Sequence, residues 1–206
     1  MTDRNQEDLR YMQMALDMAK LGRGYTNPNP MVGAVIVKDG QVIAKGYHHC
    51  CGQGHAEVEA FKDAGNQDVT GATIYVTLEP CSHYGKTPPC ADKIIEKKIG
   101  RVVVGALDPN PLVAGRGIEK IRNAGIEVTT GVLAEESIKL NEIFMKYIVN
   151  KEPFVLYKSA MSLDGKIATA SGESQWISCE VSRKEVHELR HQYMAIMVGS
   201  QTVLDD

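Results

Sequence analysis

Along the first 150 residues, segments with the hydrophobic spacing of a helix alternate with short apolar runs. Leu9, Met12, Leu16 and Ala19 recur at the spacing of one helical face, which predicts a helix over residues 3–21. Other segments are short apolar runs without that spacing, as is typical of buried strands. The predicted strands are 31–37, 41–47, 73–79, 101–107 and 126–132. The further predicted helices are 55–65, 91–98, 115–125 and 133–149.

The connections between these segments predict how the strands pair. Asp39-Gly40 separates the first two strands, and this dipeptide favours a tight hairpin and an antiparallel pair. The later strands are separated by helices, which favours parallel crossovers. The sequence therefore predicts a layered α/β domain with a mixed sheet.

The pattern restarts near residues 151–153. A strand is predicted to begin the segment 153–168, followed by a helix over 180–192 and a strand over 195–200. This second unit has 54 residues (153 to 206), too few to bury much of its own surface. We therefore expect a domain over 1–150 and the opening part of a larger domain over 151–206.

Composition narrows the class of partner. Proteins that bind long nucleic acids usually have a basic face, and a formal net charge of −3 gives no indication of one. We therefore expect a small-molecule substrate rather than nucleic acid. The polar N-terminus lacks a signal-like apolar core, and no run approaches about 18 apolar residues, so we expect a cytoplasmic protein without membrane spans. Five cysteines, an odd number, do not suit a disulfide framework and leave reduced thiols for metal.

Three residues form a candidate zinc site. His55, Cys81 and Cys90 offer Zn²⁺ one imidazole and two thiolates and leave the fourth tetrahedral position open, as in catalytic zinc sites. Cys90 precedes the predicted helix 91–98, where the helix dipole favours a thiolate.

Glu57 is the candidate proton carrier. It follows His55 by two positions, about 200° around a regular helix, so both serve one site only if His55 lies outside the regular turns. Glu57 is then free to act as a general base and acid, rather than as a ligand. A His-x-Glu followed by Pro-Cys and a later Cys matches the zinc-deaminase signature.

Other interpretations use the same residues. Cys50 or Cys51 would supply a fourth ligand in a closed, structural zinc site of an interaction module, or there is no metal at all. A deaminase of nucleosides, nucleotides or transfer-RNA bases would share the chemistry. Glu57 argues against a purely structural site. The eight residues between Cys81 and Cys90, together with the acidic charge, argue against the other deaminases.

Four segments carry a family resemblance. In this order, the sequence contains TNPNPMVGAVIVKDG, GHAEVEA, TLEPCSHYGKTPPC and DPNPLVAGRG, and it resembles the bacterial bifunctional riboflavin-biosynthesis deaminase/reductase. SAMSLDGKIA and SGESQWI resemble the start of that family's reductase domain. The resemblance implies a cytidine-deaminase-like three-layer domain with a mixed central sheet, followed by the truncated start of a dihydrofolate-reductase-like α/β domain.

The resemblance also implies an activity. The family deaminates 2,5-diamino-6-ribosylamino-4(3H)-pyrimidinone 5′-phosphate with zinc and then reduces the ribosyl group of the product with NADPH. We expect a homo-oligomer. The positions that match the family's deaminase substrate contacts are Asn29, His48, Lys86, Asp108 and Asn110. Lys86 suits a phosphate as a mobile point charge, whereas both asparagines precede prolines and are also typical turn residues.

The second unit matches part of a reductase site. The positions that match NADP contacts are Ala160, Trp176, Thr202 and Asp206, and those that match substrate contacts are Ser174 and Arg190. Most of the family's reductase domain lies beyond this sequence. We therefore expect a chain that deaminates but does not oxidise NADPH, whether it is a fragment or a natural truncation.

Overall fold

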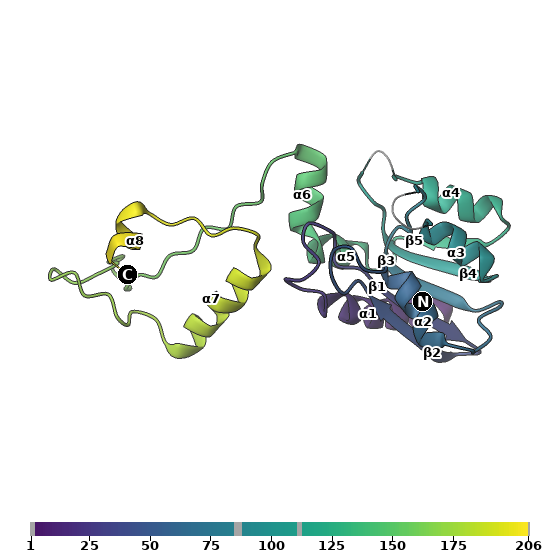
Figure 1. Ribbon diagram of the computed structural model, residues 1–206. Helices are drawn as coiled ribbons and strands as arrows, with labels where there is room; N and C mark the ends of the chain where they lie inside the picture. The colour runs from purple at the N-terminus through teal and green to yellow at the C-terminus, as the bar shows by residue number, and fades with distance from the viewer. Residues whose placement is uncertain (1–2, 85–87, 111–112, 206) are drawn as a thin grey trace. The chain divides into compact units, whose positions relative to one another are not determined.

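The computed structural model describes residues 3–84, 88–110 and 113–205 and divides into two compact units, Met1–Phe154 and Val155–Asp206. The first unit is built on a five-stranded sheet (Figure 1). In chain order its strands are β1 (Gly33–Lys38), β2 (Gln41–Tyr47), β3 (Thr73–Leu78), β4 (Arg101–Ala106) and β5 (Glu127–Thr130). The described residues of the second unit form the helices α7 (Glu180–Gln192) and α8 (Ser200–Asp205).

The sheet is mixed and has the order β2-β1-β3-β4-β5. β1 pairs antiparallel with β2 and β3, while β3, β4 and β5 are parallel. Asp39 and Gly40 have φ angles of 52° and 73°, as a two-residue hairpin turn with the right-handed twist of the sheet requires. The predicted mixed α/β fold, with its hairpin, is confirmed.

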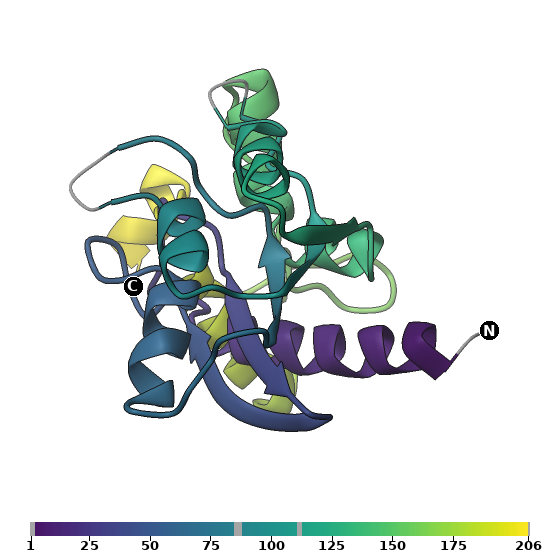
Figure 2. The ribbon, with the colours of Figure 1, turned by 90° about the vertical axis from the view of Figure 1, so that its right-hand side faces the viewer.

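Helices cover both faces of this sheet (Figure 2). Residues of β1 alternate between the faces: Ala34 and Ile36 belong to one hydrophobic cluster, Val35 and Val37 to the other. The helices that contribute to the first cluster are α2 (Ala56–Ala64), α3 (Cys90–Glu96) and α4 (Arg116–Asn123). The second cluster is covered by α1 (Asp3–Lys20). This three-layer arrangement gives the first unit a buried core on each side of the sheet.

The prediction of one long helix over 133–149 is wrong. Two helices occupy this segment, α5 (Ala134–Leu140) and α6 (Glu142–Asn150), and Asn141 lies between them with φ −110° and ψ 24°. The buried side chain of Asn141 binds the backbone of Met31: Met31 N–H donates to Oδ1 at 2.7 Å, and Nδ2 donates to Met31 O at 2.9 Å. The Asn141 amide thus satisfies both backbone groups of Met31, just before β1, and the helix is interrupted at this residue.

In the second unit only the predicted helix over 180–192 is confirmed, as α7. The predicted strands in 153–168 and 195–200 do not form, and Ser200 instead begins α8. A strand needs a hydrogen-bonded neighbour, and none is present among the described residues of this unit, whereas a helix satisfies its own backbone. None of the described helices in either unit is long and apolar enough to cross a bilayer.

Candidate metal centre and substrate site

His55 lies at the mouth of α2, as the sequence requires. Its φ of −71° and ψ of 163° are extended, and regular helical turns begin only at Ala56. The His55 carbonyl accepts the N–H of Glu59 at 3.0 Å, so the residue caps the helix without joining it. Glu57 is in the first turn and is buried. Extended backbone at His55 thus lets its imidazole and the Glu57 carboxylate serve one site.

Cys81 and Cys90 approach the same point from two elements. Cys81 follows the end of β3, and Cys90 is the first residue of α3 and is buried. Their backbones are joined by the N–H of Ala91, which donates to Cys81 O at 3.1 Å. The N–H of Cys90 itself lies 3.3 Å from Cys81 Sγ. The helix start therefore fixes both sulfur atoms.

The donor set fits Zn²⁺. His55 Nδ1 lies 3.5 Å from Cys81 Sγ and 3.3 Å from Cys90 Sγ. Tetrahedral zinc with ordinary bond lengths separates nitrogen and sulfur ligands by about 3.6 Å. In the described part of the chain, Cys50 and Cys51 do not belong to this cluster. Three protein ligands and an open fourth position are the pattern of a catalytic zinc site.

The charges of the cluster are interdependent. The pKa of Cys81 is lowered to about 4, first by a hydrogen bond from the Cys90 thiol and also by His55. The pKa of Cys90 is raised, first by that hydrogen bond and then by burial. Burial, reinforced by the charge of Cys81, raises the pKa of Glu57 to about 7. One thiolate is thus already favoured in the cluster, and Glu57 can take up and release a proton near neutral pH.

Asn29 and His48 form a pair beside the metal ligands. His48 is buried, its Nδ1 lies 2.9 Å from Gly54 O, and its Nε2 lies 3.1 Å from Asn29 Nδ2. Because a carbonyl oxygen only accepts, Nδ1 carries the proton and Nε2 accepts from Asn29, which fixes the orientation of the Asn29 amide. Burial lowers the pKa of His48 and favours this neutral form. The ring lies edge-on to His55, with centroids 5.8 Å apart.

Asp108 and Asn110 lie in the connection that follows β4. The N–H of Asn110 donates to Asp108 Oδ1 at 2.8 Å, which closes a tight turn. The pKa of Asp108 is raised, first by burial, with contributions from the negative charges of Glu79 and Cys81. The N–H of Asp108 lies 3.4 Å from Oε2 of Glu79, which stands two residues before the ligand Cys81. Two other predicted positions, Lys86 and Asp206, lie outside the described residues.

Tyr84 and Glu79, for which the sequence predicts no role, make contacts in this region. The Tyr84 hydroxyl donates to Asp92 of α3 at 2.7 Å, and Asp92 also pairs with Lys120 of α4, which ties the loop after Cys81 to both helices. Sequence reasoning also missed Glu79, whose buried carboxylate accepts backbone N–H groups of α4 and its connection. The only signal for Glu79 is its place directly before Pro80-Cys81.

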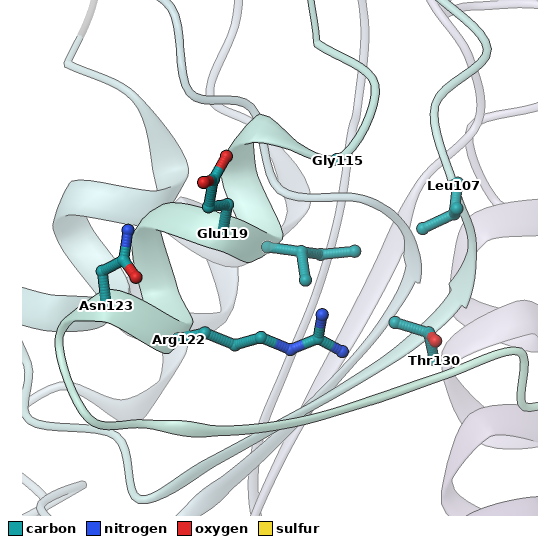
Figure 3. Close-up of a pocket in the computed structure, with 7 residues that line it drawn as sticks. Leu107, Gly115, Glu119, Arg122, Asn123 and Thr130 are labelled. Carbon is teal, nitrogen blue, oxygen red and sulfur yellow. The ribbon is translucent and has the colours of Figure 1, made fainter.

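A separate open cavity of about 390 Å³ lies between α4 and the ends of β4 and β5 (Figure 3). Leu107, Arg122, Asn123 and Thr130 are among its lining residues, and Arg122 extends across it toward Thr130. None of the predicted site residues lines it. The cavity therefore does not coincide with the metal cluster.

The positions predicted for the reductase site are mostly solvent-exposed within their unit. Ser174, Trp176, Arg190 and Thr202 are exposed, and Ala160 is half-buried. Arg183 lies over the Trp176 ring, 4.2 Å from its centroid. The described residues of this unit form no buried group around these side chains.

Comparison with known proteins agrees with this geometry. Residues 5–106 match the cytidine and deoxycytidylate deaminase zinc-binding region, and residues 153–206 match the RibD C-terminal domain. The chain is 57% identical to riboflavin biosynthesis protein RibD of Actinobacillus pleuropneumoniae over 199 residues, covering 97% of this chain and 53% of that protein. The Escherichia coli K12 RibD is 50% identical over 200 residues, with 97% and 54% covered.

Solved structures of similar proteins point to the same family. The diaminohydroxyphosphoribosylaminopyrimidine deaminase/5-amino-6-(5-phosphoribosylamino)uracil reductase of Thermotoga maritima has a TM-score of 0.94 at 52% identity, covering 98% of this chain and 58% of that one. Acinetobacter baumannii RibD, form 1, has a TM-score of 0.91 at 49% identity, covering 98% and 56%. The chain thus spans a little over half the length of these relatives.

The mixed sheet, the His-Cys-Cys cluster and the first family match together define a protein of the zinc-dependent deaminase class. With the second match and the relatives that extend across both units, the chain belongs to the RibD family of riboflavin biosynthesis proteins. The family resemblance seen in the sequence is confirmed, as is zinc as the metal of this class.

Proposed function

We propose that residues 1–150 form a deaminase domain that hydrolyses the exocyclic amine of 2,5-diamino-6-ribosylamino-4(3H)-pyrimidinone 5′-phosphate and releases ammonia. The observation that carries the proposal is the three-donor cluster of His55, Cys81 and Cys90 with the buried Glu57 beside it. The name of the Thermotoga maritima relative, 52% identical over nearly the whole chain, supports this substrate.

In this proposal, His55, Cys81 and Cys90 hold the metal, and Glu57 moves the protons. When bound, Zn²⁺ supplies Lewis acidity that makes water a nucleophile near neutral pH. Glu57 accepts a proton from the attacking water and donates it to a ring nitrogen, then carries the second proton to the departing amine. The ring carbon gains oxygen from water and loses nitrogen as ammonia, so no redox partner is needed for this reaction.

Four described side chains are proposed to hold the substrate. His48 lies edge-on to His55 and is hydrogen-bonded to Asn29, and the fixed amide and neutral ring suit the edge of a pyrimidine. Asp108 and Asn110, joined in one turn, suit the remaining ring or sugar hydroxyls. These assignments are supported by their match to the family's positions, by the edge-on arrangement of His48 and His55, and by the Asp108 N–H, 3.4 Å from Glu79 Oε2 in the segment that carries Cys81.

Lys86 is proposed to bind the phosphate, on the strength of the sequence alone. A charge-assisted contact of this kind contributes about 1.5–3 kcal/mol. Lys86→Ala should therefore raise the KM for the phosphorylated substrate at least about tenfold, and should change the KM of the dephosphorylated analogue little. Equal losses for the two substrates would remove Lys86 from the phosphate site. Lys93→Ala is a control, because Lys93 pairs with Glu96 on α3.

The experiment that tests the function is ammonia release with a matched pair of variants. Glu57→Gln should retain zinc and fold but lose about 10²–10⁴-fold in turnover, because an amide cannot accept and return a proton. Glu59→Gln, two residues further on the same helix, should retain activity, since Glu59 pairs with Lys62. No ammonia from the unaltered chain would refute the proposed substrate. Full turnover in Glu57→Gln would refute the proton role.

For the second unit we propose the opening part of an NADPH-dependent reductase domain, over residues 151–206. The support is its match to the RibD C-terminal domain. Ala160, Trp176, Thr202 and Asp206 are then proposed NADP contacts, and Ser174 and Arg190 proposed substrate contacts. Binding of NADPH to the chain, measured by fluorescence, tests whether this unit retains any nucleotide site.

Cytoplasmic location and self-association are also proposals. Free cysteines, among them the exposed Cys51 and Cys179, support a reducing compartment. Exposed Tyr147 and Val149 on α6 support an association surface. Light scattering on the purified chain should give a mass that is a multiple of the monomer, and a monomeric mass would refute the oligomer.

A further inference from the structure

Glu79 is buried and makes contacts that binding of the metal does not explain. It is the last residue before Pro80-Cys81, and its side chain is buried. Its backbone N–H donates to Ala106 O at 3.0 Å, at the carboxyl end of β4. Glu79 thus joins the segment that carries the metal ligand Cys81 to the strand that leads into Asp108.

The carboxylate of Glu79 accepts four backbone N–H groups. Oε2 accepts from Gly115 at 2.9 Å and from Asp108 at 3.4 Å. Oε1 accepts from Gly117 at 3.1 Å and from Ile118 at 3.5 Å. Two of these donors, Asp108 and Gly115, belong to the β4–α4 connection (residues 107–115), and the other two, Gly117 and Ile118, belong to the first turn of α4. One side chain therefore holds both ends of this connection.

The packing around Glu79 allows little alternative. A Cβ atom on Gly117 would lie 2.0 Å from Pro80 O, so α4 starts in direct contact with the Glu79-Pro80 backbone. The first N–H groups of a helix have no partner within the helix, and a buried carboxylate satisfies them while matching the positive end of its dipole. The acidic residue that α4 itself has in its first turn, Glu119, is solvent-exposed.

We propose that Glu79 is a positioning residue for the substrate: its carboxylate holds the β4–α4 connection, and so Asp108, against the segment that carries Cys81. The inference rests on the proposed function and deepens it. Glu79 acts through Asp108 and does not touch substrate or metal. Replacing the carboxylate should therefore weaken substrate binding while leaving metal binding and the proton transfers of Glu57 in place.

The test compares Glu79→Gln with Glu119→Gln in the zinc-loaded chain. A glutamine offers one acceptor atom and turns two N–H groups toward backbone donors, so at least one pair of hydrogen bonds is lost. We expect the amide hydrogens of Gly115 and Gly117 to exchange at least about tenfold faster in Glu79→Gln and at the unaltered rate in Glu119→Gln. This measurement needs no substrate.

Kinetics separate positioning from a merely structural role. Glu79→Gln should raise the KM for the phosphorylated pyrimidine at least about tenfold, with kcat within about threefold and zinc content unchanged. In the Asp108→Asn background the same change should have almost no further effect on KM, because the residue through which it acts is gone. Should Glu79→Gln not fold, Glu79→Asp, which keeps the charge but is one methylene shorter, should give a smaller change of the same kind.

Three results would overturn the proposal. They are an unchanged KM despite faster exchange, loss of zinc together with kcat, and full additivity with Asp108→Asn. A lack of ammonia release by the unaltered chain would instead refute the proposed function. In that case the exchange rates of Gly115 and Gly117 still decide whether Glu79 holds the connection.

Discussion

The two units of this chain differ most in what they bury. In Met1–Phe154, Met12, Ile36 and Ile74 are fully buried against the two faces of the sheet. In Val155–Asp206, no described side chain is buried, and apolar Leu163 and Met197 are almost fully exposed. Both units have apolar runs that predict strands, but only the first has neighbours to pair with them. Hydrophobic pattern alone therefore gives a strand only where a partner surface exists.

The largest expected difference between the units is in amide hydrogen exchange. Peptides from β3 and β4 should be protected by a factor of about 10³ or more relative to peptides from residues 155–178, because exchange from a buried sheet requires opening of the core. Limited proteolysis should accordingly cut after about Lys151 before it cuts the first unit. Equal protection of both units would show that the second unit has a buried core of its own, and would contradict the difference in burial between the units.

The same contrast explains what the sequence could predict. His55, Glu57, Cys81 and Cys90 stand in short local motifs, and the extended backbone required at His55 follows from helix geometry alone. Such features depend on neighbours along the chain. The hairpin at Asp39-Gly40 was predictable for the same reason.

Features that depend on distant partners were not predictable. Asn141 interrupts the segment 133–149 because its amide binds Met31, 110 residues away. Glu79 receives its donors from residues 29 to 39 positions further on, and nothing in its own surroundings along the chain indicates them. A single sequence indicates which residues are able to bind, but not which remote backbone group they meet in the fold.

The second expected difference concerns metal binding by cysteines of the two units. Cys81→Ser should lower zinc affinity more than about 100-fold, since a hydroxyl is a poor replacement for a thiolate ligand. Cys179→Ser, on an exposed side chain of the second unit, should leave the metal content near one zinc per chain. Elemental analysis after dialysis against a weak chelator measures both. Full retention of zinc in Cys81→Ser would remove Cys81 from the ligand set.

The third difference is the cost of removing one methionine from each unit. Met12→Ala should lower the free energy of unfolding of the first unit by about 2–5 kcal/mol, because the cavity left in the cluster with Tyr11, Val35 and Val103 cannot fully collapse. Met197→Ala, in the second unit, should change the free energy of unfolding by less than about 0.5 kcal/mol, since that side chain is exposed. Urea unfolding followed by circular dichroism gives both values. Similar losses for the two variants would mean that Met197 is buried in solution.

The smallest expected effect is a pH dependence confined to the first unit. Arg101 donates to both carboxylate oxygens of Asp8 at 2.7 Å, and the Tyr75 hydroxyl donates to Oδ1 at 2.9 Å. Burial acts to raise the pKa of Asp8, but the hydrogen bonds from Arg101 and Tyr75 outweigh it, so the pKa is lowered in the folded chain. A lowered carboxyl pKa stabilises the fold above the unfolded value of about 3.9, and that contribution is lost as the pH falls through the folded value.

This sign is tested by urea unfolding between pH 7 and pH 3. The unaltered chain should be more stable than Asp8→Asn at pH 7, and the difference should narrow below about pH 4, where the protonated Asp8 resembles asparagine. Asp164→Asn, an exposed position of the second unit, should differ from the unaltered chain by less than about 0.5 kcal/mol throughout. A difference for Asp8→Asn that stayed constant down to pH 3 would show that the variant acts through packing and not through the charge. The acid sensitivity of the first unit would then have to come from other carboxylates.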